Sequence, residues 1–189
     1  MNEVKKPIVV IDTNIFWHAI KGQDYESRIL KDAVNGSSFD YRITMTQPTD
    51  IENSENPNIV RHKDKMLKAI EHYSMGMLGK GRYDSALRKM MWAAEDVEKS
   101  DIEMVEDALK ADALCLVSND KRLVEACSED VFLSLSQMNP QLYGGMCFSV
   151  YMGPDFCMRY DDRIVTLSPL EKIKNRLKRK VFDWSGKIL

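Results

Sequence analysis

The sequence predicts an α/β fold of three layers, α/β/α, around a central and mainly parallel sheet. Two short apolar runs, Ile8–Ile11 and Ala113–Val117, have the composition of buried strands that are covered by helices on both faces. Amphipathic segments separate these runs and give the order β-α-α-β-α-α-α-β-α-β. That order is typical of a sheet whose strands are joined by crossover helices.

Length and composition narrow the class of protein. The chain has 189 residues, of which 44% are hydrophobic and 30% charged, as expected for one globular domain with or without an appendage. Apolar runs fall far short of the roughly 20 residues of a membrane span, and the N-terminus does not resemble a signal peptide. The four cysteines contain no C-x-x-C spacing, which argues against a zinc knuckle. We therefore expect a cytoplasmic protein with reduced thiols and no membrane partner.

In the first half of the chain, Pro7 leads into the first strand, which stops at Asp12. Apolar residues at helical spacing, ended by Asn35-Gly36, predict a helix that follows a first short one. The polar stretch that contains Pro48 and Pro57 predicts a loop with about one helical turn. The elements expected here are a strand at Ile8–Ile11, helices at Ile15–Ile20 and Asp24–Val34, a strand at Tyr41–Thr46 and a loop at Gln47–Asn58.

In the second half, the break at Gly79-Lys80-Gly81 separates two helical stretches. Ser100 and Glu103 have the spacing of a capping box, which predicts a helix start at Ser100. The elements expected here are helices at Asn58–Leu78, Tyr83–Glu98, Ser100–Ala111 and Asp120–Cys127, strands at Ala113–Ser118, Val131–Leu135, Phe148–Met152 and Ile164–Leu167, and a closing helix at Pro169–Phe182.

The charge is distributed unevenly along the chain. The net charge is -2, but Ser168 to Leu189 carries seven basic and two acidic residues, so residues 1–167 carry -7. We expect a main domain at 1–167 and a basic C-terminal helix and tail at 168–189. The basic face of that helix is either a solvated surface or an RNA contact, because phosphate binding is mostly electrostatic. Its candidate contact residues are Lys172, Lys174, Arg176, Lys178, Arg179 and Lys180.

Acidic residues follow both apolar strands in the same way. Asp12 comes directly after Ile8–Ile11, and Asp120 follows the strand at Ala113–Val117 after Ser118-Asn119. Asp101 lies in the first turn of the helix that leads into this second strand. Because parallel strands place their carboxyl ends at one edge of a sheet, the three carboxylates are expected to converge there. Converging carboxylates need a counter-charge such as Mg²⁺, which points to metal-assisted phosphodiester hydrolysis.

These residues also resemble the motifs of a known family, the PIN-domain ribonucleases. Ile8 to Asn14 looks like the first motif, and Asp101 together with Leu116 to Leu123 resembles the third and fourth. The resemblance covers roughly residues 7–135 and implies a parallel sheet between helices. It implies cleavage of RNA that depends on Mg²⁺ or Mn²⁺, with Asp12, Asp101 and Asp120 as metal-binding acids. Asn14 and Ser118 match the polar positions that support these acids.

The family has one more acid, a glutamate early in the helix after the second strand. Glu52 is the first candidate here and Asp50 the second, although Asn53 to Pro57 interrupts the expected apolar helix. This departure keeps open an inactive scaffold that binds RNA or protein, and the family also contains toxins of toxin–antitoxin pairs. RNA is the expected partner, and a homodimer or an antitoxin-like protein is compatible with the resemblance.

Each acid also has a purely structural interpretation. Asp12 suits a helix N-cap, Asp120 suits a turn, and Asp101 stabilises the dipole of its helix in any case. Glu52 is the last residue of a Thr-x-x-Glu capping box. The functional interpretation therefore depends on the acids occurring together, and a shared site is its testable consequence.

Overall fold

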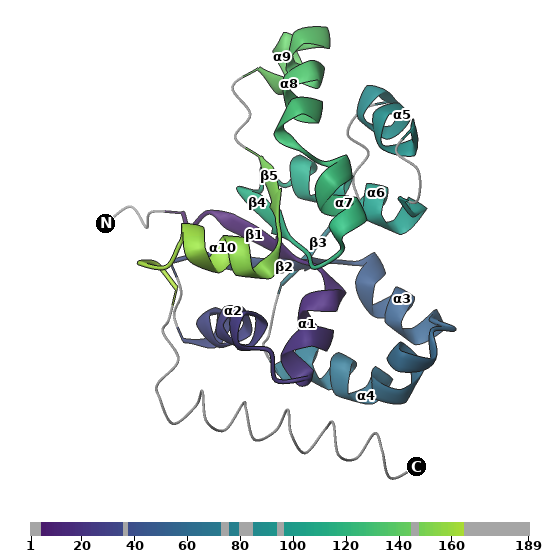
Figure 1. Cartoon of the computed structure of the whole chain (residues 1–189), viewed down its shortest axis with the longest axis vertical. Coiled ribbons are helices and arrows are strands. Elements are labelled where there is room, and N and C mark those ends of the chain that lie inside the picture. The colour runs from purple at the N-terminus through teal and green to yellow at the C-terminus, as the bar shows by residue number, and fades with distance from the viewer. Residues whose placement is uncertain are drawn as a thin grey trace.

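The chain forms a five-stranded parallel sheet between two layers of helices, which confirms the predicted fold class (Figure 1). The computed structural model describes residues 5–35, 38–72, 76–79, 85–93, 97–144 and 148–164. The strands are β1 (Ile8–Ile11), β2 (Asp40–Thr44), β3 (Gly76–Leu78), β4 (Cys115–Val117) and β5 (Ser149–Tyr151), in the spatial order β3-β2-β1-β4-β5.

The two apolar runs of the sequence are neighbours in this sheet. β1 pairs in parallel with β4 on one side and with β2 on the other, so that Val9 lies beside both Cys115 and Tyr41. The backbone N–H of Asp12 donates to the carbonyl of Val117 over 2.9 Å, which extends the pairing one residue beyond β1. The carboxyl ends of β1 and β4 therefore lie side by side at one edge of the sheet.

Helices cover both faces of the sheet (Figure 1). One face is covered by α1 (Thr13–Ile20), α2 (Asp24–Val34), α3 (Thr46–Asn53), α4 (Pro57–His72) and α10 (Gly153–Arg159). The other is covered by α5 (Ser85–Ala93), α6 (Lys99–Lys110), α7 (Lys121–Ala126), α8 (Glu129–Met138) and α9 (Pro140–Tyr143). None of the described helices is long and apolar enough to cross a membrane.

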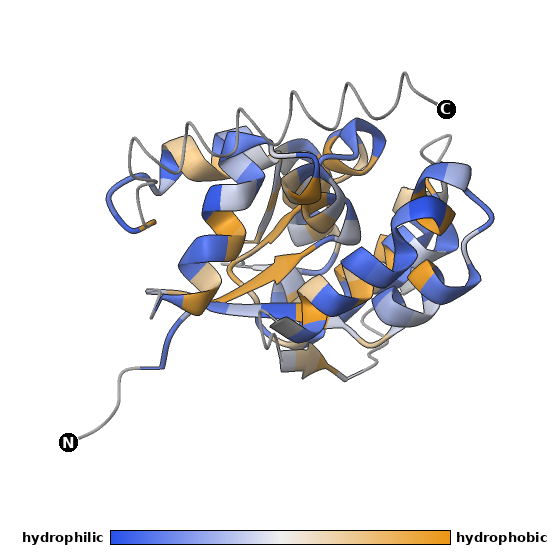
Figure 2. Cartoon of the chain, turned by 90° about the horizontal axis from the view of Figure 1, so that it is seen from below, coloured by the Kyte–Doolittle hydropathy of each residue, from blue (hydrophilic) through white to orange (hydrophobic). Residues whose placement is uncertain are grey.

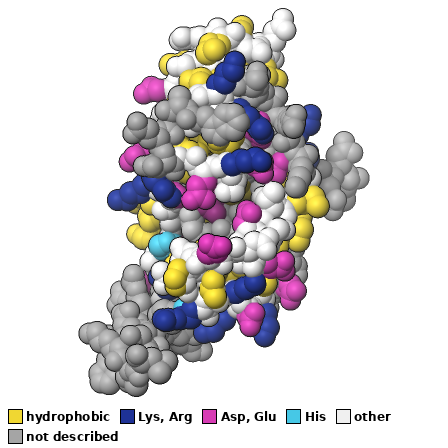
Figure 3. All heavy atoms as spheres, turned by 90° about the vertical axis from the view of Figure 1, so that its right-hand side faces the viewer, with side chains coloured by type: hydrophobic (Ala, Val, Ile, Leu, Met, Phe, Trp, Pro, Cys, Tyr) yellow, Lys and Arg dark blue, Asp and Glu magenta, His cyan; other side chains and the backbone are white. Residues whose placement is uncertain are grey.

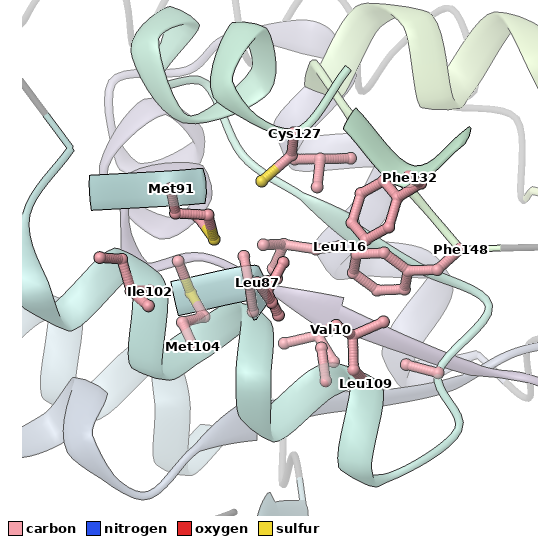
Figure 4. Close-up of a cluster of buried hydrophobic side chains, with 14 of the residues drawn as sticks. Val10, Leu87, Met91, Ile102, Met104, Leu109, Leu116, Cys127, Phe132 and Phe148 are labelled. Atoms are coloured by element: carbon pink, nitrogen blue, oxygen red, sulfur yellow. The ribbon is translucent and has the colours of Figure 1, made fainter. Parts of the chain in front are cut away.

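The apolar strands divide the core into two clusters, one on each face of the sheet. Successive strand residues point to opposite faces, so Val9 and Ile11 enter one cluster and Val10 enters the other. Figure 2 shows the hydrophobic strands between helices that have polar outer faces. Figure 4 shows the cluster around Val10, where side chains from β4, α5, α6 and α8 meet. This double cover explains why both strand sequences are apolar throughout.

The segment after β2 differs from the prediction. Thr46–Asn53 is the helix α3 rather than a loop, because Pro48 falls in its first turn, where a missing N–H costs no hydrogen bond. The buried side chain of Gln47 accepts from the N–H of Thr44 at 2.7 Å and donates to the carbonyl of Ile11 at 2.9 Å. These bonds attach the start of α3 to the ends of two strands. Further on, α4 stops at His72, and residues 76–78 form β3 instead of a helical turn.

Two other local predictions are wrong. Val131–Leu135 belongs to the helix α8 and not to a strand: Phe132 and Leu135 are buried while Leu133 is exposed, which is a helical period. The helix α6 begins at Lys99 with Glu98 as its N-cap, so the predicted capping box at Ser100 does not form. Asp101 takes the third helical position, and its carboxylate accepts from the N–H of Glu98 at 3.2 Å. The strand predicted at Phe148–Met152 is confirmed as β5.

The C-terminal predictions fall mostly on residues that the structure does not describe. Of the expected strand at Ile164–Leu167, only Ile164 is described, and it is buried in a bend. The expected helix at Pro169–Phe182 and its six basic candidates for RNA contact lie outside the described residues. The division at 167/168 accordingly stays a prediction.

Gly153, at the start of α10, is a glycine whose substitution we predict to cost stability. A Cβ atom there would lie 3.0 Å from Oε1 of Glu26 and 3.1 Å from Oδ1 of Asn119, both held in a hydrogen-bonded cluster. Gly153→Ala should lower the free energy of unfolding by about 1–2 kcal/mol, measured in urea. Gly79→Ala is the matched control, because nothing lies within 4 Å of its Cβ position. Equal stability of the two variants would contradict this packing.

Candidate functional site

Asp12, Asp101 and Asp120 line the same pocket, as the sequence predicts. Asp12 follows β1, Asp101 lies in the first turn of α6, and Asp120 caps α7 just after β4. Asp50 of α3 and Glu98 also line the pocket. Figure 3 shows the molecule from the right-hand side of Figure 1, with acidic side chains around the middle of the visible face and basic side chains around them. The acids are thus brought together from segments far apart in the sequence.

Asp12 is held in place by its neighbours on both sides of the carboxylate. Its Oδ2 accepts from Nδ2 of Asn14 and from Oγ of Ser118, both at 2.6 Å, and its Oδ1 accepts from Oγ1 of Thr13 at 3.1 Å. Burial raises the pKa of Asp12, while the hydrogen bonds from Ser118, Thr13 and Asn14 lower it. Asp12 is only 7% exposed, and these hydrogen bonds fix the orientation of its carboxylate in advance of any ligand.

Asn14 and Ser118 connect the two strand ends. Besides its bond to Asp12, Asn14 donates from Nδ2 to Ser118 Oγ at 3.0 Å and accepts from the N–H of Asn119 at 2.9 Å. Ser118 Oγ also accepts from the N–H of Asp120 at 3.0 Å. Asn14 and Ser118, which the sequence predicts as supports of the acids, both donate hydrogen bonds to the Asp12 carboxylate. The network fixes the turn that carries Asp120 against the turn that carries Asp12.

An outer layer of this network was not apparent from the sequence. Asn119 donates from Nδ2 to the buried carboxylate of Glu26 at 2.7 Å, and its Oδ1 accepts from the N–H of Gly153 at 3.0 Å. Glu26 is 1% exposed although it lies on an amphipathic helix among other charged residues. No local pattern of the sequence signals this burial: the neighbouring Tyr25 is 43% exposed, so α2 turns the glutamate and not the tyrosine inward.

Asp120 is both a helix cap and the partner of an arginine. It accepts from the N–H of Arg122 at 2.9 Å, and the guanidinium donates to both of its carboxylate oxygens at 3.3 and 3.0 Å. Burial acts to raise the pKa of Asp120, but the hydrogen bonds and charge of Arg122 outweigh it, and the pKa is lowered. Asp120 is therefore ionised at neutral pH. Arg122, which sequence reasoning missed, brings a positive charge to the pocket wall.

Asp101 experiences the combined charge of the site. Its pKa is raised to about 6, first by burial and then by the negative charge of Asp12, with a further contribution from Asp120. The N–H of Glu98 acts in the opposite direction but does not compensate. A carboxylate in such surroundings costs folding free energy at neutral pH. Functional sites are where this kind of cost is commonly found.

The fourth predicted acid is Asp50 by position, not Glu52. Asp50 lines the pocket with the other acids, whereas the exposed Glu52 does not. The backbone carbonyl of Glu52 accepts from Nζ of Lys63, which directs this end of α3 toward α4. The family resemblance favours Glu52 as the glutamate after the second strand, but the helical turn that begins at Thr46 brings Asp50 to the pocket instead.

Ser118 offers a direct test of the supporting network. Ser118→Ala removes the donor to Asp12 and leaves a buried carboxylate oxygen with one hydrogen bond fewer. We expect the free energy of unfolding to fall by about 1–3 kcal/mol in a urea titration. Ser134→Ala is the control, since that exposed hydroxyl bonds only a carbonyl of its own helix. A loss no larger than that of the control would mean that Ser118 does not hold Asp12.

The donor set fits a hard divalent cation. Carboxylate oxygens are the ligands that Mg²⁺ prefers, and it commonly takes one or two of them while keeping several waters. Within the described residues, no three His, Cys, Asp or Glu side chains are close enough to share one ion. The pocket therefore suits an ion held by one or two carboxylates, with the others compensating its charge from further away.

Comparison with known proteins adds little to this geometry. No protein-family model matches the sequence, and no curated protein matches it. Among solved structures, the chain is similar to the crystal structure of VapBC2 from Rickettsia felis bound to a DNA fragment from their promoter. The TM-score is 0.41 and the sequence identity 12%, over 77% of this chain and 98% of that one. A likeness at this distance transfers neither residues nor activity.

Proposed function

We propose that this chain is an endoribonuclease of the PIN type that hydrolyses RNA phosphodiester bonds with the help of Mg²⁺ or Mn²⁺. The observation that supports it best is the pocket itself, where Asp12, Asp101 and Asp120 meet from three separate elements. Two of these carboxylates raise the pKa of the third. A fold gains nothing in stability from that arrangement, so a ligand that offsets the charge is its natural explanation.

The metal would be held by Asp12 and Asp101, with Asp120 and Asp50 at the same pocket. When bound, such an ion neutralises charge on the phosphoryl group and activates water for hydrolysis. The chain's own residues prepare this chemistry: Ser118 and Asn14 fix the Asp12 carboxylate. Arg122 lies at the pocket wall, where it can pair with an RNA phosphate as well as with Asp120.

The test is cleavage of a labelled RNA of mixed sequence by the full chain. We expect cleavage with Mn²⁺ or Mg²⁺ and none in EDTA, with products that carry 5′-phosphate and 3′-hydroxyl ends. Cleavage that persists in EDTA would contradict the mechanism. Cleavage of DNA at an equal rate would contradict the substrate class.

A second candidate function is an RNA-binding scaffold that does not cut. Two observations favour it: Arg122 already pairs with Asp120, and no three of the described acids can share an ion. Calorimetric titration with Mn²⁺ separates the two candidates. Binding of the ion supports the nuclease, whereas RNA binding without any Mn²⁺ binding supports the scaffold.

The remaining expectations from the sequence are untested and stay predictions. They concern a homodimer, an antitoxin-like protein partner, a cytoplasmic location and the RNA contact of the basic C-terminal helix. Co-purification of a small protein with the full chain would support the antitoxin-like partner.

A further inference from the structure

The acids of the pocket have a cation of this chain among them. Of the described residues that line the pocket, Arg122 is the only lysine or arginine, whereas five carry carboxylates. Within the described residues, Asp12 and Asp101 take part in no ion pair, while Arg122 pairs with Asp120. We call the region around the carboxylates the acidic part of the pocket; its acids are Asp12, Asp50, Glu98, Asp101 and Asp120.

The guanidinium of Arg122 binds both carboxylate oxygens of Asp120. Nε lies 3.3 Å from Oδ1 and Nη2 lies 3.0 Å from Oδ2, so one whole edge of the guanidinium is used. These hydrogen bonds and the charge of Asp120 raise the pKa of Arg122, although desolvation opposes them. The charges of Glu98 and Asp101 raise it further. The arginine is thus attracted by the acidic part as a whole, and not by its capping partner alone.

This ion pair can be exchanged without damage to the fold. The side chain of Arg122 is 53% exposed and that of Asp120 is 23% exposed, and ion pairs so open to water are weak. Asp120 keeps its position without the guanidinium, because its Oδ1 also accepts from the backbone N–H of Arg122 and its own N–H donates to Ser118. Departure of the arginine side chain therefore leaves α7 capped and the Asp120 carboxylate at the pocket.

A divalent cation and the arginine compete for the same negative charge. The ion carries twice the charge of a guanidinium, and the two cations repel each other when they share a pocket. Carboxylate oxygens are the ligands that Mg²⁺ prefers, whereas the guanidinium edge that fits a carboxylate fits a phosphate equally well. With an ion among the acids and a phosphate beside them, each cation has a suitable partner.

We propose that Arg122 is an exchangeable counter-charge of the acidic part, which a divalent cation displaces from Asp120 toward a phosphate of the bound RNA. In the absence of metal the arginine neutralises Asp120 and lowers the affinity of the pocket for the ion. The inference rests on the proposed function for the identity of the ion and the polymer. It adds a prediction of its own, that loss of this arginine strengthens metal binding.

Calorimetric titration of the full chain with Mn²⁺ alone tests the exchange. Arg122→Gln should bind Mn²⁺ about fivefold more tightly than the wild type, as the loss of one positive charge near a divalent ion gives in water. Lys121→Gln is the matched control: it also removes a positive charge at the start of α7, but Lys121 is exposed and does not line the pocket. Its Mn²⁺ affinity should stay within twofold of the wild type. Arg122→Lys, which keeps the charge, should bind Mn²⁺ less tightly than Arg122→Gln.

NMR follows the arginine side chain itself. During a titration of the wild type with Mg²⁺, the Nε–H resonance of Arg122 should move toward that of free arginine as the ion saturates the pocket. A resonance that stays in place at saturating Mg²⁺ would overturn the displacement.

The outcomes separate this inference from the proposed function. Equal or weaker Mn²⁺ binding by Arg122→Gln, together with Mn²⁺-dependent cleavage by the wild type, would reject the counter-charge and leave the nuclease. Mn²⁺ binding by Arg122→Gln but not by the wild type would support the counter-charge and reject the nuclease. Absence of Mn²⁺ binding in both proteins would overturn both proposals.

Discussion

Asp12→Asn should lower the rate of metal-dependent RNA cleavage by roughly 100-fold or more, because changes even to the partners of metal ligands cost 10–100-fold. The substitution removes the charge at the most enclosed position of the site and keeps the size of the side chain. Asparagine can still accept a hydrogen bond from Ser118 or Thr13, so the network around β1 is altered at one oxygen only. The loss should therefore appear in activity far more than in folding.

Initial rates on a labelled RNA at saturating Mn²⁺ measure this effect, with circular dichroism as the check on folding. The control is Asp130→Asn, an exposed aspartate in the first turn of α8 on another part of the molecule. It should cleave at the wild-type rate. If Asp12→Asn keeps more than a tenth of the activity, Asp12 is a helix cap and not part of a catalytic site.

Asp101→Asn should make the protein more stable at neutral pH while it abolishes cleavage. The folded-state pKa of Asp101 is about 6, above its ordinary 3.8, so the ionised carboxylate is disfavoured in the fold. The shift corresponds to roughly 3 kcal/mol, and partial exposure reduces the expected gain to about 1–2 kcal/mol. Asparagine keeps an oxygen that can accept from the N–H of Glu98, so the start of α6 is preserved.

The stability difference between Asp101→Asn and the wild type should depend on pH. The contribution of Asp101 to the free energy of unfolding of the wild type is fully present below about pH 3.8 and is lost as the pH rises through about 6. The advantage of Asp101→Asn should thus be absent near pH 3.5 and complete above pH 7, in urea titrations with EDTA present. Glu103→Gln, on the same helix in an exposed i,i+4 pair with Lys99, should change stability by less than about 0.5 kcal/mol. An Asp101→Asn variant less stable than wild type at pH 7 would show that the acids do not repel one another.

The features that could be predicted from the sequence are those encoded locally. The runs before Asp12 and Asp120 are apolar at every position, which fixes them as doubly covered strands and places both acids at the carboxyl edge. That placement needs no knowledge of the helices in between. The same reasoning applies to Asp101. The helix α6 leads into the start of β4, so its own first turn, which carries Asp101, must lie near the carboxyl edge of the sheet.

The sequence predictions that were wrong, or that missed a residue, concern features that depend on contacts between residues far apart in the sequence. Whether Thr46–Asn53 is helical depends on Gln47, whose amide bonds the end of β1, 36 residues away. This decides that Asp50 and not Glu52 lines the pocket. In Val131–Leu135, alternating and helical periods both fit the apolar residues, and packing of Phe132 on Phe148 selects the helix. Glu26 is buried through a bond to Asn119 that no local pattern encodes.

The central claim is that the pocket lined by Asp12, Asp101 and Asp120 binds a divalent cation through one or two of these carboxylates. A crystal soaked in Mn²⁺ and measured for anomalous scattering tests it most directly. The structure predicts an anomalous peak in the acidic part of the pocket, about 2.1 Å from an oxygen of Asp12 or Asp101, as for ions of the Mg²⁺ type. An ordered pocket without a peak, with Mn²⁺ bound elsewhere or not at all, would contradict it.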